Sequence, residues 1–258
     1  MPSIITEIKN NIGIITLNRP DKFNAFNKEM ALLLQTILND FGNDKTVKAI
    51  YLTGNGKAFS AGQDISELTG ENPPTINQIL AEHYNPIVTT IRTLPKPIVC
   101  AVNGVAAGAG ANIALACDIV VATVSANFIQ AFSKIGLIPD SGGTFTLPRL
   151  IGFQKASALM LLGDKVSATD AEKMGMIYKV FADDVFSEES FKIAITLSQL
   201  PTQALALIKQ ALNASFTNTL QQQLQIEDTL QQQAANTYDF KEGIAAFTEK
   251  RLPIFKGK

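Results

Sequence analysis

The sequence predicts a layered α/β fold with crossover connections, followed by a helical C-terminal segment. Short apolar strands alternate with amphipathic helices, and the order of two strands followed by a helix occurs more than once. From Pro201 onward, apolar residues recur at helical spacing between glutamines. The 258 residues are 46% hydrophobic and 17% charged, so the chain can bury a sizeable core.

The first strands and helix are predicted at the N-terminus. Residues 3–8 and 12–17 are β-branched runs joined by a turn at Asn10 and Asn11. Apolar residues at helical spacing over 30–41 predict an amphipathic helix that ends near Gly42. Val47 then begins a short apolar strand that ends at Thr53.

The same order recurs between residues 75 and 123. The predicted elements are a helix (75–92), a strand (98–102), a loop (104–110), a helix (111–116) and a strand (119–123). Residues 98–117 carry no charge over a length that could cross a bilayer, but their glycines and asparagines favour a buried strand, turn and helix. With no signal-peptide pattern at the N-terminus, we expect a cytoplasmic protein without a membrane span.

Composition also narrows the partners and the chemistry. The net charge of −1 and the pI of about 5.9 argue against a nucleic-acid partner. His83 is the single histidine, and Cys100 and Cys117 lie in apolar runs as expected for reduced core thiols. A zinc site or a Ser-His-Asp triad is therefore not expected. Ile113 replaces the third glycine of a dinucleotide fingerprint. The chemistry that remains is carboxylate acid/base catalysis assisted by backbone dipoles.

Two glycine-rich loops each lie between a strand and a helix, at residues 58–64 and 103–110. Small residues let a ligand approach backbone N–H groups, and free N–H groups at a helix start carry partial positive charge. Two such loops that converge would form an oxyanion hole for a carbonyl oxygen. Taken singly, each loop is better explained as an ordinary tight turn, and it is the pair that suggests the oxyanion hole.

Asp140 lies in a third notable stretch, residues 136–144, between an apolar segment and a predicted helix. Its ordinary role would be to cap the N-terminus of that helix. Its alternative role is catalytic, since a carboxylate that faces an apolar acyl pocket has a raised pKa and can shuttle protons. The local sequence by itself favours the cap.

These three stretches, in this order, resemble the crotonase (enoyl-CoA hydratase/isomerase) superfamily. The resemblance runs from the Leu-Asn-Arg-Pro segment at 17–20 to the tail at 245–251 and includes the Cys-Asp-Ile segment at 117–119. It implies a crotonase-like spiral of ββα units in residues 1–195, which carries a CoA thioester site. It also implies a helical oligomerisation region in residues 196–258, and hence a homo-oligomer, either a trimer or a dimer of trimers.

The resemblance also implies roles for individual residues. The backbone amides of Gln63 and Ala109 match the oxyanion hole of the family. Four further residues match positions along the CoA moiety of the substrate, mostly through backbone contacts: Ala25, Ala61, Asp64 and Ile65. Coenzyme A is thus part of an acyl-CoA substrate, and no separate cofactor is expected.

Departures from the family pattern indicate an isomerase. Family hydratases activate water with two glutamates, and Asn112 and Phe132 stand at those positions here. Neither side chain exchanges protons with water at neutral pH, so we expect little hydration. Asp140 matches the single acid/base of certain isomerases in the family, with Phe132 as a wall of the acyl pocket. The segments at 84–86, 94–97, 104–111 and 131–140 most resemble the ring 1,2-epoxyphenylacetyl-CoA isomerases of phenylacetate degradation.

Two other functions stay open at this point. One is a general delta-3,delta-2-enoyl-CoA isomerase of fatty-acid oxidation. The other is a non-catalytic family member that binds acyl-CoA or RNA, against which the acidic pI and the retained Asp140 both argue.

Overall fold

A six-stranded sheet forms the centre of the computed structural model, which describes residues 1–69 and 72–258. Its strands lie in the order β1-β2-β3-β5-β7-β10, and every neighbouring pair except the β1–β2 hairpin is parallel. The bounds are β1 (Ile4–Lys9), β2 (Ile12–Leu17), β3 (Ala49–Gly54), β5 (Ile98–Val102), β7 (Ile119–Thr123) and β10 (Lys179–Phe181). The strands expected at 3–8, 12–17, 47–53, 98–102 and 119–123 are all present, within two residues at each end.

A second, four-stranded sheet was not predicted. It consists of β4 (Ala58–Ser60), β6 (Val105–Ala107), β8 (Asn127–Ile129) and β9 (Lys165–Ser167), in that order. The expected loop at 104–110 therefore contains a strand, β6. Three-residue strands in glycine-rich segments show too little alternation to be recognised. The strands β4, β6 and β8 each follow a strand of the large sheet. Each turn of the chain therefore adds one strand to the large sheet and one to the small sheet, and the successive turns form a spiral.

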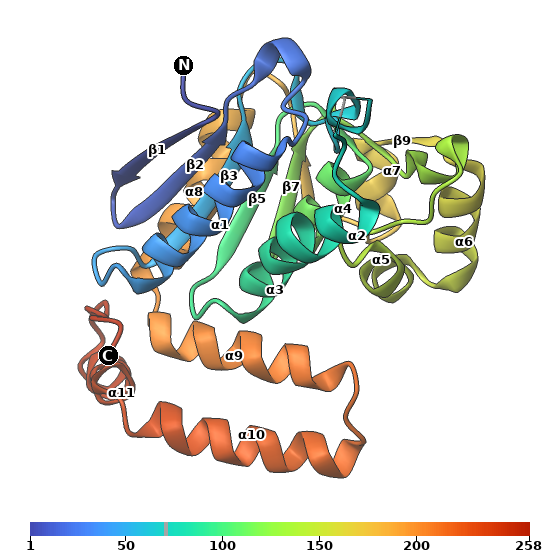
Figure 1. Cartoon of the computed structure of the whole chain (residues 1–258). Coiled ribbons are helices and arrows are strands. Elements are labelled where there is room, and N and C mark those ends of the chain that lie inside the picture. The colour runs from blue at the N-terminus through green and yellow to red at the C-terminus, as the bar shows by residue number, and fades with distance from the viewer. Residues whose placement is uncertain (70–71) are drawn as a thin grey trace.

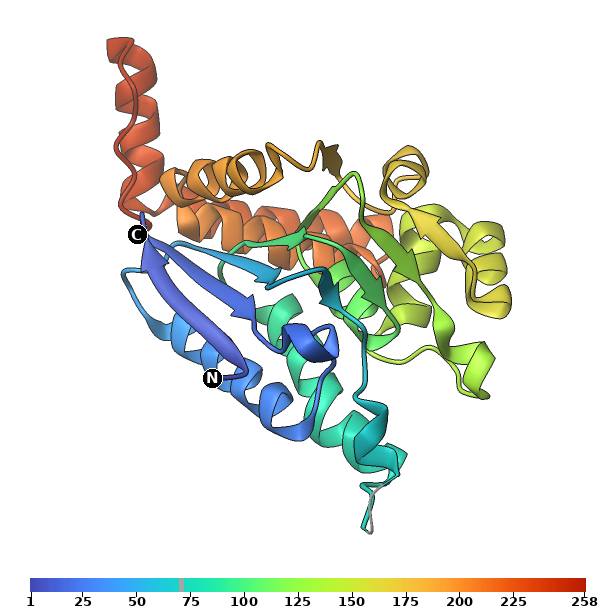
Figure 2. The same cartoon turned by 90° about the horizontal axis from the view of Figure 1, so that it is seen from above.

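Helices cover both faces of the large sheet (Figure 1, Figure 2). On one face, α1 (Lys28–Asn43), α3 (Asn85–Thr93) and α4 (Ala109–Ala116) belong to the main apolar core. On the other face, α8 (Phe186–Gln199) packs its buried Phe186 and Ala194 against the sheet. Beside α4, the chain continues through α5 (Gly143–Ile151), α6 (Phe153–Leu162) and α7 (Ala168–Lys173).

Local sequence explains where several elements begin and end. Asn10 and Asn11 both have positive φ, as the tight β1–β2 turn requires. The Asn27 side chain caps α1 by accepting from the Met30 amide. The predicted helix at 75–92 is present, but it is built from α2 (Ile76–Gln78), a π-helical turn η3 (Ile79–Tyr84) and α3. Shorter 3-10 turns are η1 (Pro20–Lys22), η2 (Ile65–Leu68) and η4 (Ala131–Ile135).

The C-terminal helices lie beyond one end of the large sheet (Figure 1). They are α9 (Thr202–Ser215), α10 (Leu220–Ala235) and α11 (Tyr238–Glu249), so the predicted helical segment is confirmed. The boundary expected at residue 196 falls inside α8, and the chain changes element at Leu200 and Pro201 instead. Lys209 of α9 contacts the core through an ion pair with Asp118, at 2.7 Å.

Two smaller expectations concern the thiols and the apolar segment at 98–117. Cys100 and Cys117 are free and buried, as predicted. The uncharged segment forms β5, β6 and α4. Among the helices that the structure describes, none alone has the length and apolarity of a membrane span. Only α8 and α9 together have that length and apolarity, and they form a pair bent by 105°.

Candidate active site

A cavity of about 330 Å³ opens where the two glycine-rich loops meet the segment that carries Asp140. It is lined by six residues singled out in the sequence: Ala61, Gln63, Ile65, Ala109, Phe132 and Asp140. The rest of the lining is almost entirely apolar: Leu68, Ile76, Ile79, Leu80, Tyr84, Gly108, Ala131, Ile135, Leu137, Ile138 and Pro139. The structure thus brings together segments that lie up to 79 positions apart, from Ala61 to Asp140.

Gln63 reaches the cavity through a short parallel bridge to Phe26. The Phe26 amide donates to the Gly62 carbonyl at 2.7 Å, and the Asp64 amide donates to the Phe26 carbonyl at 2.8 Å. In such a bridge, the N–H and C=O of the intervening residue point away from the partner strand. The Gln63 amide is therefore directed away from Phe26.

Ala109 is the first residue of α4. The first intrahelical bond runs from the Asn112 amide to the Gly108 carbonyl, at 3.1 Å, so the Ala109 amide has no acceptor within the helix. The two loops touch through Gly62, which has φ +90°. A Cβ there would lie 2.8 Å from the Ala107 carbonyl oxygen and 3.3 Å from the Ala109 nitrogen. Glycine is thus required where the loops meet, and the backbones of residues 62 and 109 lie close together.

Asp140 lines the cavity with a partly buried carboxyl group. Burial raises its pKa, while a hydrogen bond from Ser141 Oγ to Oδ1, at 2.8 Å, acts in the opposite direction. Helix α5 begins at Gly143 with Gly142 as its N-cap, and no side chain caps it. The helix-capping role that the local sequence favoured is therefore wrong, and the Asp140 carboxyl lies at the cavity instead.

Tyr84 is a cavity residue that analysis of the sequence did not identify as functional. It is buried at the end of the π-helical turn η3, and its hydroxyl donates to Gln63 Oε1 at 2.6 Å. Burial raises the pKa of this phenol, and the nearby charge of Asp140 adds to the effect. Gln63 Nε2 in turn donates to Glu67 Oε2 at 3.0 Å. The contact between Tyr84 and Gln63 joins residues 21 positions apart, so no local sequence pattern could have indicated it.

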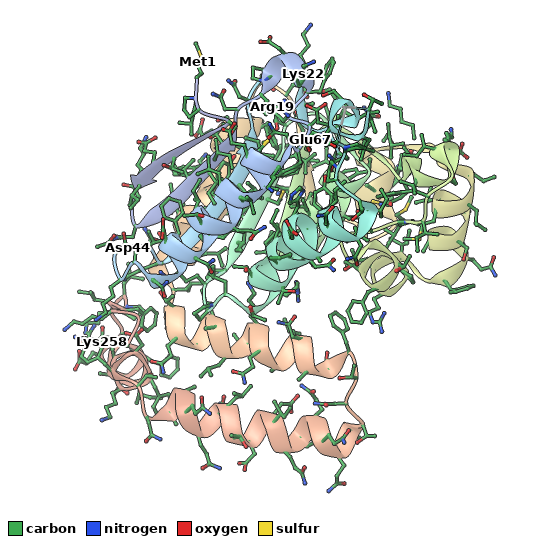
Figure 3. All side chains as sticks on the ribbon, viewed as in Figure 1. Met1, Arg19, Lys22, Asp44, Glu67 and Lys258 are labelled. Atoms are coloured by element: carbon green, nitrogen blue, oxygen red, sulfur yellow. The ribbon has the colours of Figure 1, made fainter. Side chains whose placement is uncertain are left out.

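Ala25 and Asp64, two of the residues expected along CoA, are not part of the cavity lining. Both contact Arg19, whose guanidinium donates to the Ala25 carbonyl and to Asp64 Oδ2, the latter at 2.8 Å. Burial disfavours the Asp64 carboxylate, but hydrogen bonds from Ser66 and Arg19 outweigh it and lower the pKa. Figure 3 shows Arg19 and Glu67 at the same end of the molecule, and Asp64 follows the cavity residue Gln63 directly in the chain.

His83 does not line the cavity, although it neighbours Tyr84 in the chain. Its side chain is buried, and burial lowers its pKa. Among the described residues, the site therefore has the composition expected of carboxylate chemistry: one acid and two backbone loops in apolar surroundings.

Comparison with known proteins identifies the family. The sequence profile described as "Enoyl-CoA hydratase/isomerase" matches residues 7–258. The chain belongs to this family. The crystal structure of a putative enoyl-CoA hydratase/isomerase from Mycobacterium abscessus superposes with a TM-score of 0.93, at 32% identity over 99% of this chain and all of that one. The predicted crotonase-type fold is thereby confirmed.

Curated family members include both isomerases and hydratases. The chain is 44% identical to the 1,2-epoxyphenylacetyl-CoA isomerase of Escherichia coli over the full length of both proteins. It is 41% identical to a probable enoyl-CoA hydratase of Rhodobacter capsulatus, over 98% of this chain and 97% of that protein. Membership of the enoyl-CoA hydratase/isomerase family thus makes this protein an enzyme of hydratase or isomerase type.

Proposed function

We propose that the protein is a CoA-thioester isomerase. Its reaction would convert ring 1,2-epoxyphenylacetyl-CoA to the oxepin-CoA, shift a double bond from delta-3 to delta-2 in enoyl-CoA, or do both. The observation that carries the proposal is that Asp140 is the one carboxyl group lining the cavity, among the residues that the structure describes. The 44% identity to an epoxyphenylacetyl-CoA isomerase supports the ring substrate.

In the proposed reaction, the thioester carbonyl oxygen lies between the amides of Gln63 and Ala109. Deprotonation at C2 places negative charge on that oxygen, and two preorganised N–H donors stabilise it. Asp140 takes the C2 proton and returns it at C4 while the double bond moves from C3 to C2. Opening and expansion of a ring epoxide is also an isomerisation, so the same carboxyl and donors would serve without a further reagent or cofactor.

A single carboxyl among the described lining residues, in apolar surroundings, favours isomerisation over hydration. Addition of water needs a second group to hold and activate the nucleophile. Phe132 is buried at the cavity wall, and the Asn112 amide is engaged by Gln130 and the Asp140 backbone. Neither side chain can act as a base towards water.

Product analysis with a panel of CoA thioesters tests the proposal. The panel includes the ring epoxide, straight-chain delta-3 enoyl-CoA and crotonyl-CoA, with chromatographic separation and mass spectrometry. An isomer keeps its mass and changes retention, whereas a hydrated product gains the mass of water. Isomerisation with little hydration of crotonyl-CoA is expected, and brisk hydration would contradict the proposal. A preference for the straight chain would instead support the general delta-3,delta-2-enoyl-CoA isomerase.

The variant Asp140→Asn is the matching control on mechanism. Its turnover should fall by about 10²–10⁴-fold, the range typical of a lost general acid/base. Affinity for a non-reactive acyl-CoA should survive, because the thioester is held by backbone donors. Unchanged turnover in this variant would remove Asp140 from the mechanism.

The proposal includes self-association through the C-terminal helices. Apolar side chains are exposed along them, including Leu220, Leu224, Ile244 and Phe247, the last at 87% of its surface. A patch of this kind is typical of a protein–protein interface. Sedimentation of the full chain should give a trimer or a dimer of trimers, and a monomer at micromolar concentration would contradict this part.

A further inference from the structure

Two buried amides, Asn112 and Gln130, lie behind Asp140. We propose that this pair positions the acid/base and fixes its distance from the oxyanion hole, an inference that rests on the proposed function. Gln130 Nε2 donates to Asn112 Oδ1 at 2.7 Å, and Asn112 Nδ2 donates to the Asp140 carbonyl at 2.9 Å. The exposed fractions are 1% for Asn112 and 5% for Gln130. Asn112, which stands where the family hydratases have a glutamate, would thus support Asp140 instead of activating water.

The chemistry of the groups fixes the orientation of both amides. The Asp140 carbonyl can only accept a hydrogen bond, so the nitrogen of Asn112 must face it. The oxygen of Asn112 is then left to accept from Gln130, which must present its own nitrogen. Gln130 Oε1 is buried without a hydrogen-bond partner in the described part of the chain. Because an unsatisfied buried oxygen is costly, its presence indicates that Gln130 is held in place by the bond to Asn112.

The backbone after Asp140 depends on this support. Ser141 and Gly142 are successive left-handed residues, with φ of +51° and +74°. Ser141 is buried and is not a glycine, so its conformation is strained. The Asp140 carbonyl accepts both from the Gly143 amide, at 2.8 Å, and from Asn112. These two bonds hold the turn in the shape that aims Ser141 Oγ at the Asp140 carboxyl.

Gly143 fits the same arrangement. A Cβ at this position would lie 2.3 Å from Asn112 Nδ2, so any other residue would push the amide away from the Asp140 carbonyl. The absence of a side chain at 143 is therefore part of the contact. It also explains why α5 begins at a glycine, which is otherwise a poor helix residue.

Helix α4 joins this support to the oxyanion hole. Ala109 opens the helix and Asn112 lies three residues later, so both are on adjacent positions of one helical turn. All eight residues of α4 are buried, which holds the helix firmly in the core. Through the bond from Asn112, the segment of the proton carrier is thereby held to the same rigid helix that carries the proposed oxyanion donor. A displacement of about 1 Å in such a site can cost on the order of 10²-fold in rate.

The decisive variant is Asn112→Asp, which keeps the shape and replaces the donor nitrogen with oxygen. An acceptor then faces the Asp140 carbonyl, and kcat should fall by about 10–100-fold. KM for the thioester should stay within about twofold, since Gln63 and Ala109 are untouched. The acid limb of the pH profile should also move, because the surroundings of the Asp140 carboxyl change.

Asn18→Asp is the matched control. Asn18 is also buried, donates from Nδ2 to the Pro2 carbonyl at 2.9 Å, and accepts at Oδ1 from Asn55 at 2.8 Å. It has the same hydrogen-bond pattern outside the cavity lining. We expect this variant to lose stability to a similar extent while kcat and the pH profile stay as in the wild type.

Gln130→Met and hydrogen exchange provide a second test should Asn112→Asp not fold. Gln130→Met removes the anchor of Asn112 together with the unsatisfied oxygen, and kcat should fall by about 3–10-fold. The Gly143 amide, which bonds to the Asp140 carbonyl, should exchange faster in either variant and not in Asn18→Asp. Wild-type kcat and wild-type exchange at Gly143 would overturn the inference.

The two proposals can fail separately. If Asp140→Asn is inactive while Asn112→Asp is folded and fully active, only the positioning role of the amide pair is overturned. If Asp140→Asn keeps full turnover, the proposed function fails, and the positioning of an acid/base fails with it.

Discussion

The cavity has two walls of different construction. One wall is main chain, formed by Gln63 and Ala109 on loops that touch through Gly62. The other is side chain, formed by Asp140 and by the apolar residues of the segment before it. Ile135 and Ile138 in that segment are 61% and 80% exposed, whereas Ala109 is buried. The main-chain wall thus reaches into the core at Ala109, whereas much of the side-chain wall lies at the surface.

On the proposed function, the difference corresponds to the two parts of an acyl-CoA substrate. Every acyl-CoA presents the same thioester carbonyl, which donors fixed by the fold can bind. The acyl chain differs from one substrate to another, and exposed side chains can change without disturbing the core. We therefore expect substitutions in the first wall to affect turnover of all thioesters and those in the second to change the preference among them.

Among substitutions in the main-chain wall, Gly62→Ala should have the largest effect on turnover. A Cβ at φ +90° is strained and collides with the Ala107 carbonyl, so the Ala109 amide must move. Loss of one oxyanion donor typically lowers kcat by about 10²–10³-fold. Steady-state kinetics on any accepted thioester measures this. Gly152→Ala is the control, because Gly152 has φ +79° but no atom of the described residues lies within 4 Å of the new Cβ. Equal losses in both variants would point to backbone strain alone.

The pH dependence of kcat/KM probes the second wall. Burial raises the pKa of Asp140, and a base must be ionised to accept a proton. The rate should therefore fall about tenfold per pH unit on an acid limb centred above about pH 4, the ordinary value for aspartate. Affinity for a non-reactive acyl-CoA over the same range separates binding from chemistry. A limb at or below pH 4 would show that the carboxyl is solvated during turnover.

Tyr84→Phe should produce a smaller loss of turnover, because Tyr84 lines the cavity and its hydroxyl supports the Gln63 side chain. The phenol packs edge-on against Phe26 and donates to Gln63, so the variant keeps the packing and loses one hydrogen bond. A bond worth about 1 kcal/mol corresponds to roughly a fivefold lower kcat. Tyr51→Phe is the control, since Tyr51 is also buried and bonds to Ser190 at 2.7 Å on the other face of the sheet. A fall in kcat for Tyr51→Phe as well would mean a general loss of stability.

The smallest expected effect is a gain in stability from Asp140→Asn. A carboxyl whose pKa is raised by folding destabilises the native state above its unfolded pKa of about 3.9. Removing the charge should raise Tm at pH 7, and the difference should vanish as the pH falls below 4. Scanning calorimetry at both pH values measures this, with the exposed Asp184→Asn as control. A lower Tm at pH 7 would mean that the carboxylate stabilises the fold.

Sequence periodicity predicted five of the six strands of the large sheet and the helices on one of its faces, because each of these elements carries many apolar residues in register; β10 and α8 were not predicted. The strand β6, with three residues in a glycine-rich loop, has no such pattern and was predicted as a loop. Its pairing with β4 and β8 is a long-range contact, which only the assembled spiral provides. Short strands of this kind are therefore fixed by the fold around them.

The site was predicted unevenly for the same reason. The glycine loops and Asp140 were identified from the sequence, but the local pattern at Asp140 favoured a helix cap that α5 does not use. Asn112 was interpreted only as a lost glutamate, because its bonds to Gln130 and Asp140 span 18 and 28 positions. Tyr84 was missed on the same ground. Local sequence thus indicates which groups are available, and their partners depend on the tertiary structure.

The complete burial of α4 has a practical consequence for redesign. No side chain of this helix faces solvent, so a larger residue anywhere along it would have to displace packed neighbours. Libraries intended to broaden the range of accepted acyl groups should therefore leave residues 109–116 unchanged. They should vary Ile76, Ile135, Leu137 and Ile138 instead, where side chains border the cavity and also reach the surface.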